Sequence, residues 1–310
     1  MAATLDDDVP VSVLPVIDAM PALRAAQCQV RRLSGGLTNM NYRVDTETAS
    51  YVLRISPPGT DLLAIDRANE HHNSVRADAV GVGAPVVDWV PEHSALLVGF
   101  IAGRTFDDTT FTEPGMIPRV ARAVRRLHGA DRFLHDFDMF ALQRRYLDIV
   151  QSRGFRLPDG YLDLAPQVQR IRAACSVRPV PTVPCNNDLL AANFIDDGTD
   201  VRIIDYEYSG NNDPYFELGN IWSECHLDDA GLAELLMHYD GRLLRSHVAR
   251  ARLLGLMSQY GWTLWGSIQA STSALDFDFW GWAMEKYERA LETFASPDLD
   301  RLIDDVQRED

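Results

Sequence analysis

The sequence has almost no lysine. Its 310 residues include 29 lysines and arginines, of which only Lys286 is a lysine. A nucleotide site of the G-x-x-x-x-G-K-S/T type needs a lysine after its glycine-rich loop, so this class of site is excluded. The formal net charge of −16 argues against a broad basic face, and so against nucleic acid or an anionic membrane as a partner. A cationic small molecule suits this charge better.

The chain is also poor in cysteine and in long apolar runs. Its four cysteines form no C-x-x-C pair, which argues against a zinc ribbon or a disulfide framework and favours the reducing cytoplasm. The N-terminal segment is acidic where a secretory signal is basic, and no stretch approaches the roughly 18 apolar residues of a membrane span. The histidines lack metal-site spacing, and Cys185 has no local histidine partner, so we expect neither a histidine metal site nor a cysteine nucleophile.

The residue pattern of 28–102 is typical of a small β-sheet. Short segments rich in β-branched and aromatic residues alternate with turns, at 29–33, 41–44, 51–55, 85–89 and 96–100. One amphipathic stretch, 61–79, follows the third segment and predicts a helix in which Leu62, Leu63, Ile65 and Val75 share a face. We therefore predict a mainly antiparallel N-lobe with one helix. Residues 1–27 are interpreted as an N-terminal extension, mobile at Asp6 to Asp8.

The remainder, 103–310, is predicted to be a larger and mainly helical C-lobe. Helical periodicity is found at 117–127, 140–150, 162–174, 232–247, 249–269 and 280–294. A short hairpin is expected at 193–195 and 201–204, and the acidic tail, 298–310, is interpreted as a solvated helix end. The fold class is thus α+β with two lobes, and the cleft between the lobes is the expected site.

The strongest chemical signal lies in the predicted hairpin region. Asp188 is followed five residues later by Asn193, and Asp205 comes after the hairpin. In phosphoryl transfer one carboxylate can accept the proton of a substrate hydroxyl, while an amide and a second carboxylate hold magnesium on the phosphates. The alternative is a structural loop, since Asp and Asn are ordinary turn residues.

A glycine-rich segment of the predicted N-lobe fits the same chemistry. The segment that contains Ser34, Gly35, Gly36, Thr38 and Asn39 lies between two strands, where its glycines can turn tightly and present N–H groups and hydroxyls to phosphates.

Downstream of that loop, Arg54 is a lone charge in an apolar strand, and Glu70 on the following helix is its expected partner. Arg54 could then bridge Glu70 and the α/β-phosphates, which is the task of a lysine in protein kinases.

An ordered series of motifs covers residues 30–294. The motifs are SGGLTNMNY, VLRI, RANEHH, CNNDLLAANF, IDYEYSGNNDPYFELGN, WTLWGSIQ and FDFWGWAMEKYER. With them the chain resembles the choline/ethanolamine kinase family, which is related to the aminoglycoside phosphotransferases. The resemblance implies a two-lobed protein-kinase-like fold that uses ATP and Mg2+, and it is compatible with a homodimer.

The resemblance also implies roles for particular residues. Asp188 is then the catalytic base, Asn193 and Asp205 are the magnesium ligands, and Glu207 is a helper near the metals. The backbone of Gly99, Phe100 and Ile101 becomes the hinge that binds adenine.

The chain departs from the family at Asn186, where the family has a histidine that acts mainly as a scaffold. Because asparagine also donates and accepts hydrogen bonds, we expect a tuned or weakened enzyme more than a dead one.

Four aromatic residues indicate the acceptor. Trp262 and Trp265 are three apart on a predicted helix, Trp282 lies on the next helix, and Tyr208 follows the second acidic motif. Such rings can attract a quaternary ammonium through cation–π contacts, although core packing is the alternative interpretation. The resemblance places these positions in a choline pocket and adds Glu224 as its negative charge.

A primary ammonium, as in ethanolamine, needs hydrogen-bond acceptors and not ring faces. The sequence therefore predicts a kinase that transfers the γ-phosphate of ATP to choline. Two alternatives stay open: another acceptor (ethanolamine, an aminoglycoside, or a different amino alcohol or sugar), and a catalytically weakened relative that binds nucleotide or choline.

Overall fold

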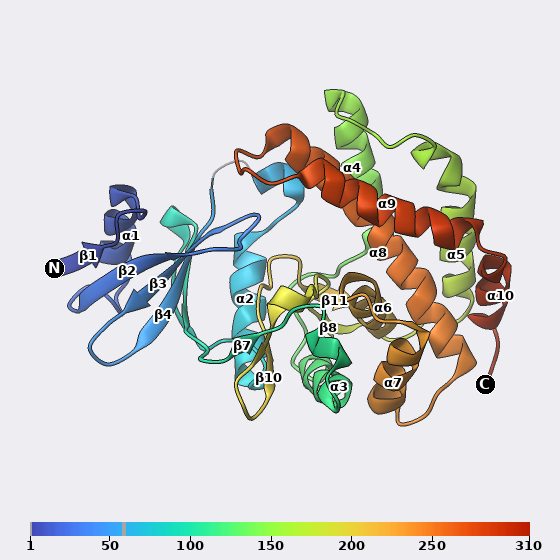
Figure 1. Cartoon of the computed structure of the whole chain (residues 1–310), viewed down its shortest axis with the longest axis horizontal. Coiled ribbons are helices and arrows are strands. Elements are labelled where there is room, and N and C mark those ends of the chain that lie inside the picture. Colours follow the sequence, from blue (N-terminus) through green and yellow to red (C-terminus); the bar gives the residue numbers. More distant parts are fainter. Residues whose placement is uncertain (1, 58–59) are drawn as a thin grey trace.

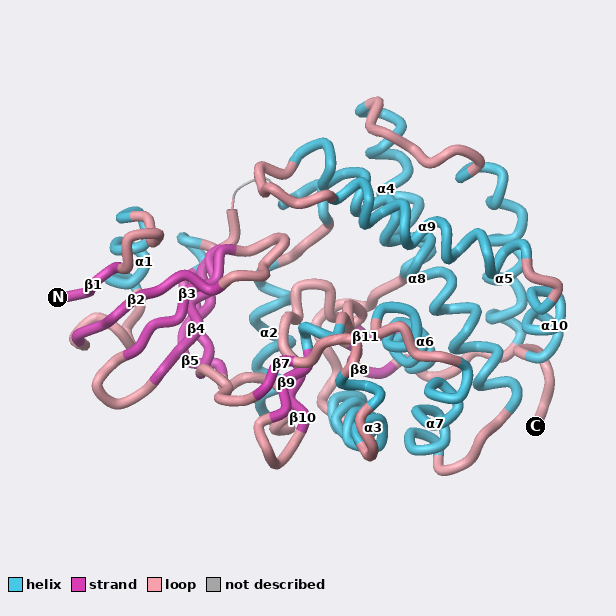
Figure 2. The backbone as a smooth tube through the Cα atoms, viewed as in Figure 1, coloured by secondary structure: helices cyan, strands magenta, loops and turns pink. Residues whose placement is uncertain are grey.

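The computed structural model describes residues 2–57 and 60–310 and arranges them in two lobes (Figure 1). One lobe is built mostly of strands and the other mostly of helices, as the colours of Figure 2 show. The chain leaves the sheet of the first lobe after Gly99 and pairs with a strand of the second lobe from Arg104 onward. Among the helices of these residues, none has both the length and the apolar character needed to cross a membrane.

The N-lobe sheet has six strands in the order β1-β2-β3-β4-β6-β5. All neighbours are antiparallel except β1 and β2, which are parallel. The strands are β1 (Ala2–Leu5), β2 (Gln27–Leu33), β3 (Met40–Asp45), β4 (Ser50–Ile55), β5 (Val86–Val90) and β6 (Ala95–Gly99). Tyr42, Leu53 and Leu97 face one another across β3, β4 and β6 and are buried, which fixes the register of the sheet. The five predicted strands are thereby confirmed.

The first 27 residues differ from the expected extension. Strand β1 completes one edge of the sheet, and helix α1 (Leu14–Ala19) buries Ile17 in the small core beneath it. The amide of Asp6 donates a hydrogen bond to the carbonyl oxygen of Val30 at 3.0 Å, so the acidic run is held in a turn against β2 and not left mobile. A sheet of this size has too little apolar area of its own, and the N-terminal residues supply the missing cover.

Helix α2 (Arg67–Ala79) is shorter than predicted. A separate 3-10 turn (Thr60–Leu63) precedes it, and the carboxylate of Asp66 caps it by accepting hydrogen bonds from the amides of Ala68 and Asn69. Val75, predicted to share its apolar face, is exposed. The buried face of α2 is polar instead, because it carries Glu70 to the junction of the lobes.

The described C-lobe is a bundle of helices with two small sheets, one of three strands (β10-β9-β7) and one of two (β11-β8). Its helices are α3 (Met116–His128), α4 (Met139–Arg153), α5 (Ala165–Val177), α6 (Pro214–Glu224), α7 (Asp229–Asp240), α8 (Arg245–Thr272), α9 (Phe279–Ala295) and α10 (Asp298–Asp305). Its strands are β7 (Arg104–Thr105), β8 (Val183–Cys185), β9 (Phe194–Asp196), β10 (Val201–Ile203) and β11 (Gly210–Asn212). Antiparallel pairing of β9 with β10 confirms the predicted hairpin.

Two helical predictions need correction. The stretch 232–247 is not one helix, because α7 ends at Gly241 in a left-handed conformation (φ +77°) and α8 starts after a break. The acidic tail is not a solvated end either, since Leu302 and Ile303 of α10 are buried in the C-lobe core.

Helix α8 is the axis of the C-lobe and is buried along most of its length. It lies against α6 at close range: a Cβ atom on Gly219 would lie only 2.0 Å from the carbonyl oxygen of Ala251. This approach fixes α6 and α8 relative to each other, and both helices carry residues of the site.

Candidate active site

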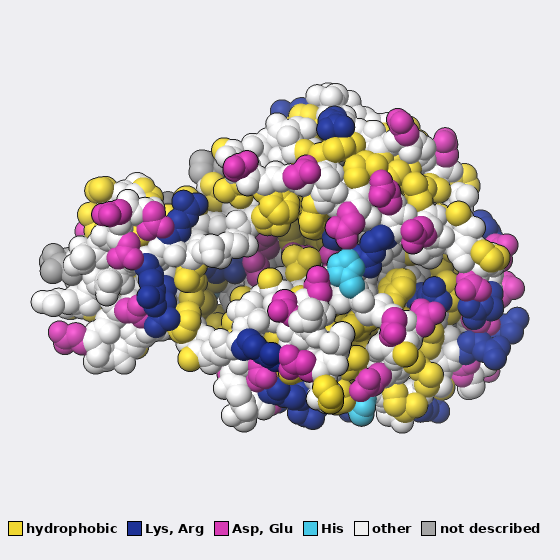
Figure 3. Space-filling model, viewed as in Figure 1, with side chains coloured by type: hydrophobic (Ala, Val, Ile, Leu, Met, Phe, Trp, Pro, Cys, Tyr) yellow, Lys and Arg dark blue, Asp and Glu magenta, His cyan; other side chains and the backbone are white. Residues whose placement is uncertain are grey.

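A cavity at the junction of the lobes gathers most of the residues that the sequence singled out. It opens where the molecular surface is hollowed between the two lobes (Figure 3). Its lining comprises Gly35, Gly36, Leu37, Thr38, Asn39, Asn41, Asp188, Leu190, Ala192, Asn193, Asp205, Glu207, Tyr208, Trp262, Trp265 and Trp282. The glycine-rich loop, the acidic loops and all four predicted aromatic residues thus share one space.

The glycine-rich loop closes over the acidic residues. Gly35 has φ +102°, and a Cβ atom on Gly36 would lie 2.5 Å from the carbonyl oxygen of Asn39, so both positions require glycine. The side-chain amide of Asn39 donates to the carboxylate of Glu207 at 2.9 Å and accepts from the hydroxyl of Ser56 at 2.9 Å. These bonds tie the N-lobe loop to the C-lobe carboxylates.

Asn186 joins the two acidic loops. Its side-chain nitrogen donates to the carbonyl oxygens of Ile204 (3.2 Å) and Asp205 (2.8 Å), and its side-chain oxygen accepts from the amide of Asp188 (3.1 Å). One buried amide therefore holds the predicted base and the predicted metal ligand in register. This is the scaffolding task that the sequence assigned to the position.

Helix α6 anchors the catalytic loop from behind. The buried carboxylate of Glu217 accepts hydrogen bonds from the amides of Asn186 (3.1 Å) and Asn187 (2.7 Å), and Asn220 accepts from the amide of Leu189 at 2.6 Å. Asn187 has φ +70°, a conformation that asparagine tolerates better than most residues. The sequence interpretation missed both anchors, although their i, i+3 spacing on a helix that follows the acidic motif was a signal.

Three carboxyl groups crowd the cavity without enough positive charge to balance them. Withdrawal from bulk water raises the pKa of Asp188 well above its usual range, and the neighbouring carboxylates of Asp205, Glu224 and Glu207 raise it further. Burial, followed by the charges of Asp205 and Glu70, raises the pKa of Glu207 to about 7. A bound cation would relieve this repulsion.

Oxygen donors suited to a hard cation are in place. The side-chain nitrogen of Asn193 donates to the carbonyl oxygen of Asp188 at 2.7 Å, which leaves its amide oxygen as the atom for a ligand. Together with the carboxylate of Asp205 it forms an all-oxygen set, the donor type that Mg2+ prefers.

Two arginines cross-link the acidic groups. The predicted pair of Arg54 and Glu70 is confirmed, at 3.2 Å, and Arg54 also contacts Asp205 at 2.6 Å. Arg67, which the sequence interpretation missed, pairs with Glu70 at 2.6 Å and with Glu207 at 3.1 Å. Both guanidinium groups still have buried nitrogens without a hydrogen-bond partner among the described residues, so they can serve an anionic group such as a phosphate.

The predicted adenine hinge is only partly available. The amide of Gly99 donates to the carbonyl oxygen of Pro85 at 2.7 Å, and that of Phe100 donates to Ser50 at 3.0 Å. These two amides therefore belong to the sheet, and of the three predicted positions the amide of Ile101 is the one left to consider for a base.

The aromatic residues form a cluster beside Asp188. The rings of Tyr208 and Trp262 lie 4.8 Å apart and those of Trp265 and Trp282 lie 5.2 Å apart, and the indole nitrogen of Trp265 donates to the hydroxyl of Tyr208 at 2.8 Å. Trp262 and Trp265 are also buried in the C-lobe core. The two interpretations of the sequence are therefore compatible, because the same rings pack the core and line the cavity.

Glu224 differs from its prediction as a free counter-charge. It ends α6 behind the aromatic cluster, and one of its oxygens forms a buried ion pair with the ammonium group of Lys286. The ammonium group in turn lies 4.1 Å from the centre of the Trp282 ring. Glu224 is not among the residues that line the cavity, and its charge is already paired.

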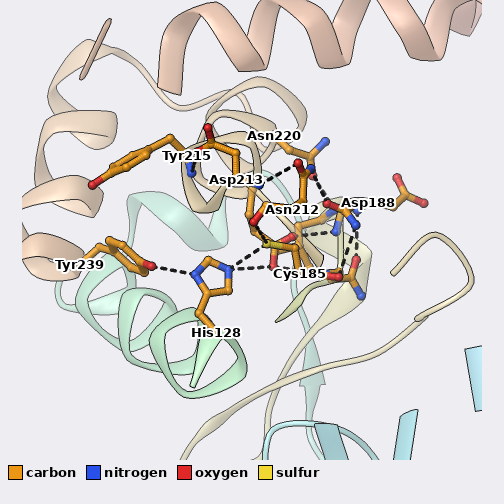
Figure 4. Close-up of polar contacts among 12 residues, drawn as sticks. His128, Cys185, Asp188, Asn212, Asp213, Tyr215, Asn220 and Tyr239 are labelled. Atoms are coloured by element: carbon orange, nitrogen blue, oxygen red, sulfur yellow. Dashed lines mark hydrogen bonds and ion pairs between the residues drawn. The ribbon is translucent and has the colours of Figure 1, made fainter. Parts of the chain in front are cut away.

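Cys185 is buried, and a histidine that is distant in the sequence lies beside it (Figure 4). Its sulfur is 3.5 Å from Nε2 of His128, and the same nitrogen is 3.5 Å from Glu217, while Nδ1 of His128 bonds to the hydroxyl of Tyr239 at 2.8 Å. Burial raises the pKa of the Cys185 thiol well above its usual range, and both Glu217 oxygens already accept loop amides. We therefore interpret this cluster as part of the loop anchor.

Comparison with known proteins gives the class of the chain. Residues 29–254 match the model of the phosphotransferase enzyme family. A choline/ethanolamine kinase family protein from Mesorhizobium loti has a solved structure that is 31% identical, with a TM-score of 0.84 over 96% of this chain and 98% of that one. The chain belongs to the choline/ethanolamine kinase family of phosphotransferases. It is a small-molecule alcohol kinase with the kinase-like fold that its sequence predicted.

Proteins named as ethanolamine kinases and as choline kinases both match the chain, at lower identity. Ethanolamine kinase 2 from Rattus norvegicus is 26% identical over an alignment that covers 93% of this chain and 82% of that protein. The structure of choline kinase LicA from Streptococcus pneumoniae is 23% identical, with a TM-score of 0.73 over 86% of this chain and 93% of that one. The choice of acceptor must therefore be argued from the cavity.

Proposed function

We propose that the protein transfers the γ-phosphate of ATP to the hydroxyl group of choline. The observation that carries this proposal is the common cavity of Asp188 and the four aromatic residues, which puts a proton acceptor beside a set of ring faces. A quaternary ammonium held by the rings would direct its hydroxyl toward the carboxylate. The N-lobe, 28–102, would bind the nucleotide, and the C-lobe, 103–310, would supply the catalytic loop and the acceptor pocket.

The reaction assigns one task to each group. The acceptor oxygen forms a bond to the γ-phosphorus, its proton passes to the carboxylate of Asp188, and the bond from phosphorus to the β,γ-bridging oxygen breaks to release ADP. Asn193 and Asp205 would hold magnesium, with Glu207 close by. Magnesium, when bound, supplies positive charge against the phosphate oxygens during transfer. Arg54 would bind the phosphates, and Ser34, Thr38 and the two loop glycines would cover them.

The polar groups of the aromatic cluster favour choline over ethanolamine. The hydroxyl of Tyr208 already accepts a hydrogen bond from Trp265, and the indole nitrogen of Trp262, which has no partner among the described residues, is a donor. A primary ammonium brings three N–H donors and finds few acceptors on the aromatic side of the cavity, away from the carboxylates, whereas a trimethylammonium group needs only ring faces. Ethanolamine is the second candidate, on the strength of the similarity to an ethanolamine kinase.

The direct test is an acceptor panel. Purified protein is assayed with ATP and magnesium on choline, ethanolamine, an aminoglycoside and no acceptor, with product phosphate esters identified by mass spectrometry. We expect phosphocholine as the main product. Phosphorylation of another acceptor, with none of choline above the blank, would contradict the proposal.

A further inference from the structure

The single lysine of the chain lies behind the acceptor pocket. Lys286 and Trp282 are four residues apart on α9 and so share a face of that helix, which packs against α8 (Figure 1). The side chain of Lys286 is only 6% exposed and that of Glu224 only 2%. This is a buried ion pair that touches the wall of the cavity.

The contacts of Lys286 are those of a bound cation. A carboxylate oxygen of Glu224 pairs with its ammonium group, and the Trp282 ring lies 4.1 Å away in cation–π range. A carboxylate and a tryptophan face are the two partners that the sequence predicted for the acceptor. The protein's own side chain therefore occupies the position of a cation against Trp282, which lines the cavity, although Lys286 and Glu224 themselves do not.

The ion pair of Lys286 and Glu224 leaves one buried polar atom unbonded among the described residues. The second oxygen of Glu224 is buried and has no hydrogen-bond partner within the described part of the chain. Glu224 is thus committed to Lys286 through one oxygen and under-bonded at the other, and such a group responds strongly to any change in its partner. The pair also acts on the predicted base, since Glu224 raises the pKa of Asp188 and Lys286 lowers it, after the larger effect of burial.

We propose that Lys286 is a specificity-determining residue that neutralises Glu224 and so limits how strongly the pocket prefers a charged acceptor. An acceptor cation then gains the ring faces but receives no net counter-charge from Glu224, and it is repelled by the ammonium group. This inference rests on the proposed function and adds that the substrate class is a bulky amino alcohol recognised mainly by aromatic contact. Removing the charge of Lys286 should leave the negative charge of Glu224 unpaired behind Trp282, where it attracts an acceptor cation.

The test compares choline with its neutral isostere, 3,3-dimethylbutan-1-ol, in the full chain. The two molecules have the same shape, so the ratio of their dissociation constants isolates the effect of charge. Tryptophan fluorescence titration measures binding without turnover. In Lys286→Met the preference for choline over the isostere should rise about tenfold, because a buried opposite charge becomes available.

Two further variants separate charge from packing. Lys286→Arg keeps the charge and should keep the wild-type ratio, and the double variant Glu224→Gln/Lys286→Met removes both charges and should return the ratio to within about threefold of wild type. A Lys286→Met ratio equal to that of wild type, with both ligands weakened alike, would mean that the lysine only supports the fold and would overturn the inference. If Lys286→Met does not fold, Lys286→Gln takes its place and should shift the ratio in the same direction.

A result that contradicts the proposed function can be distinguished from one that contradicts the inference about Lys286. A wild-type protein that binds choline but phosphorylates another alcohol contradicts the choline kinase proposal, while the binding ratio still reports on Lys286. A wild-type protein that binds neither choline nor its isostere overturns both.

Discussion

The two sides of the catalytic loop differ in how far their polar groups are satisfied. On the side of α6, the backbone amides of the loop are taken up by Glu217 and Asn220 at hydrogen-bond distances. On the side of the cavity, Asp188, Asp205 and Glu207 face one another, and burial together with mutual repulsion raises the pKa of the first and the last.

This difference separates the polar groups that stabilise the fold from those that are left to bind ligands. A buried polar group costs free energy unless it is bonded, so the satisfied side stabilises the loop by itself. The cavity side has carboxylates in excess of the charges of Arg54 and Arg67, and it becomes balanced only when cations bind. Substitutions on the cavity side should therefore lower turnover alone, whereas those on the α6 side should lower stability as well.

The largest effect is expected on the cavity side. Asp188→Asn removes the proton acceptor but keeps the shape, so kcat should fall about a thousandfold. Nucleotide affinity and the melting temperature should stay at or above wild type, because a repelled charge is lost. Turnover within tenfold of wild type would show that another group takes the proton.

A change on the α6 side should affect stability as well as rate. Glu217→Gln turns one accepting oxygen into an N–H donor that faces a backbone amide, which should lower the free energy of unfolding by about 2 kcal/mol and kcat by about tenfold. Urea unfolding and steady-state kinetics measure the two effects. Glu234→Gln, on the exposed surface of α7, is the matched control and should change neither. A loss of rate without a loss of stability would contradict the anchor role.

The acceptor wall offers a matched pair on one helix. Trp282 lines the cavity, whereas Trp280, two positions earlier, packs under the guanidinium group of Arg156 at 3.9 Å. Trp282→Leu should raise the KM for choline about tenfold through the loss of cation–π attraction and leave the KM for ATP unchanged. Trp280→Leu should leave both values near wild type. Equal effects of the two variants would mean that the rings serve packing alone.

The smallest effect is expected where the two sides meet. Asn186→His introduces the histidine that the family resemblance implies at this position. Because Asn186 already bonds to Ile204, Asp205 and Asp188, the exchange should change kcat by less than about threefold in either direction. A large gain in turnover would instead support the alternative of a catalytically weakened relative.

Local patterns predicted much of the molecule. The strands, the 193–204 hairpin and the pair of Arg54 with Glu70 follow from residue type and order along the chain. The grouping of the four aromatic residues followed from the family resemblance, because their spacing alone left core packing open. Helix ends were less predictable, because Asp66 and Gly241 decide them through caps.

Partners far apart in the sequence were not predictable in the same way. Arg67 meets Glu207, His128 meets Cys185, and Lys286 meets Glu224, in each case from a different element. No periodicity links such residues, and only the packing of α2, α3 and α9 against the segments that carry Glu207, Cys185 and Glu224 brings them together.

By itself the sequence determined the chemistry available to this protein: a glycine-rich loop, an acid–amide–acid series, four aromatic residues and no lysine for a P-loop. These depend on residue type and local order, which the chain carries without folding. Tertiary structure decided which charges are already neutralised. The free energy of a buried charge depends on the groups around it in space, so the pairing of Glu224 with Lys286 and the excess of carboxylates at Asp188 exist only in the folded chain.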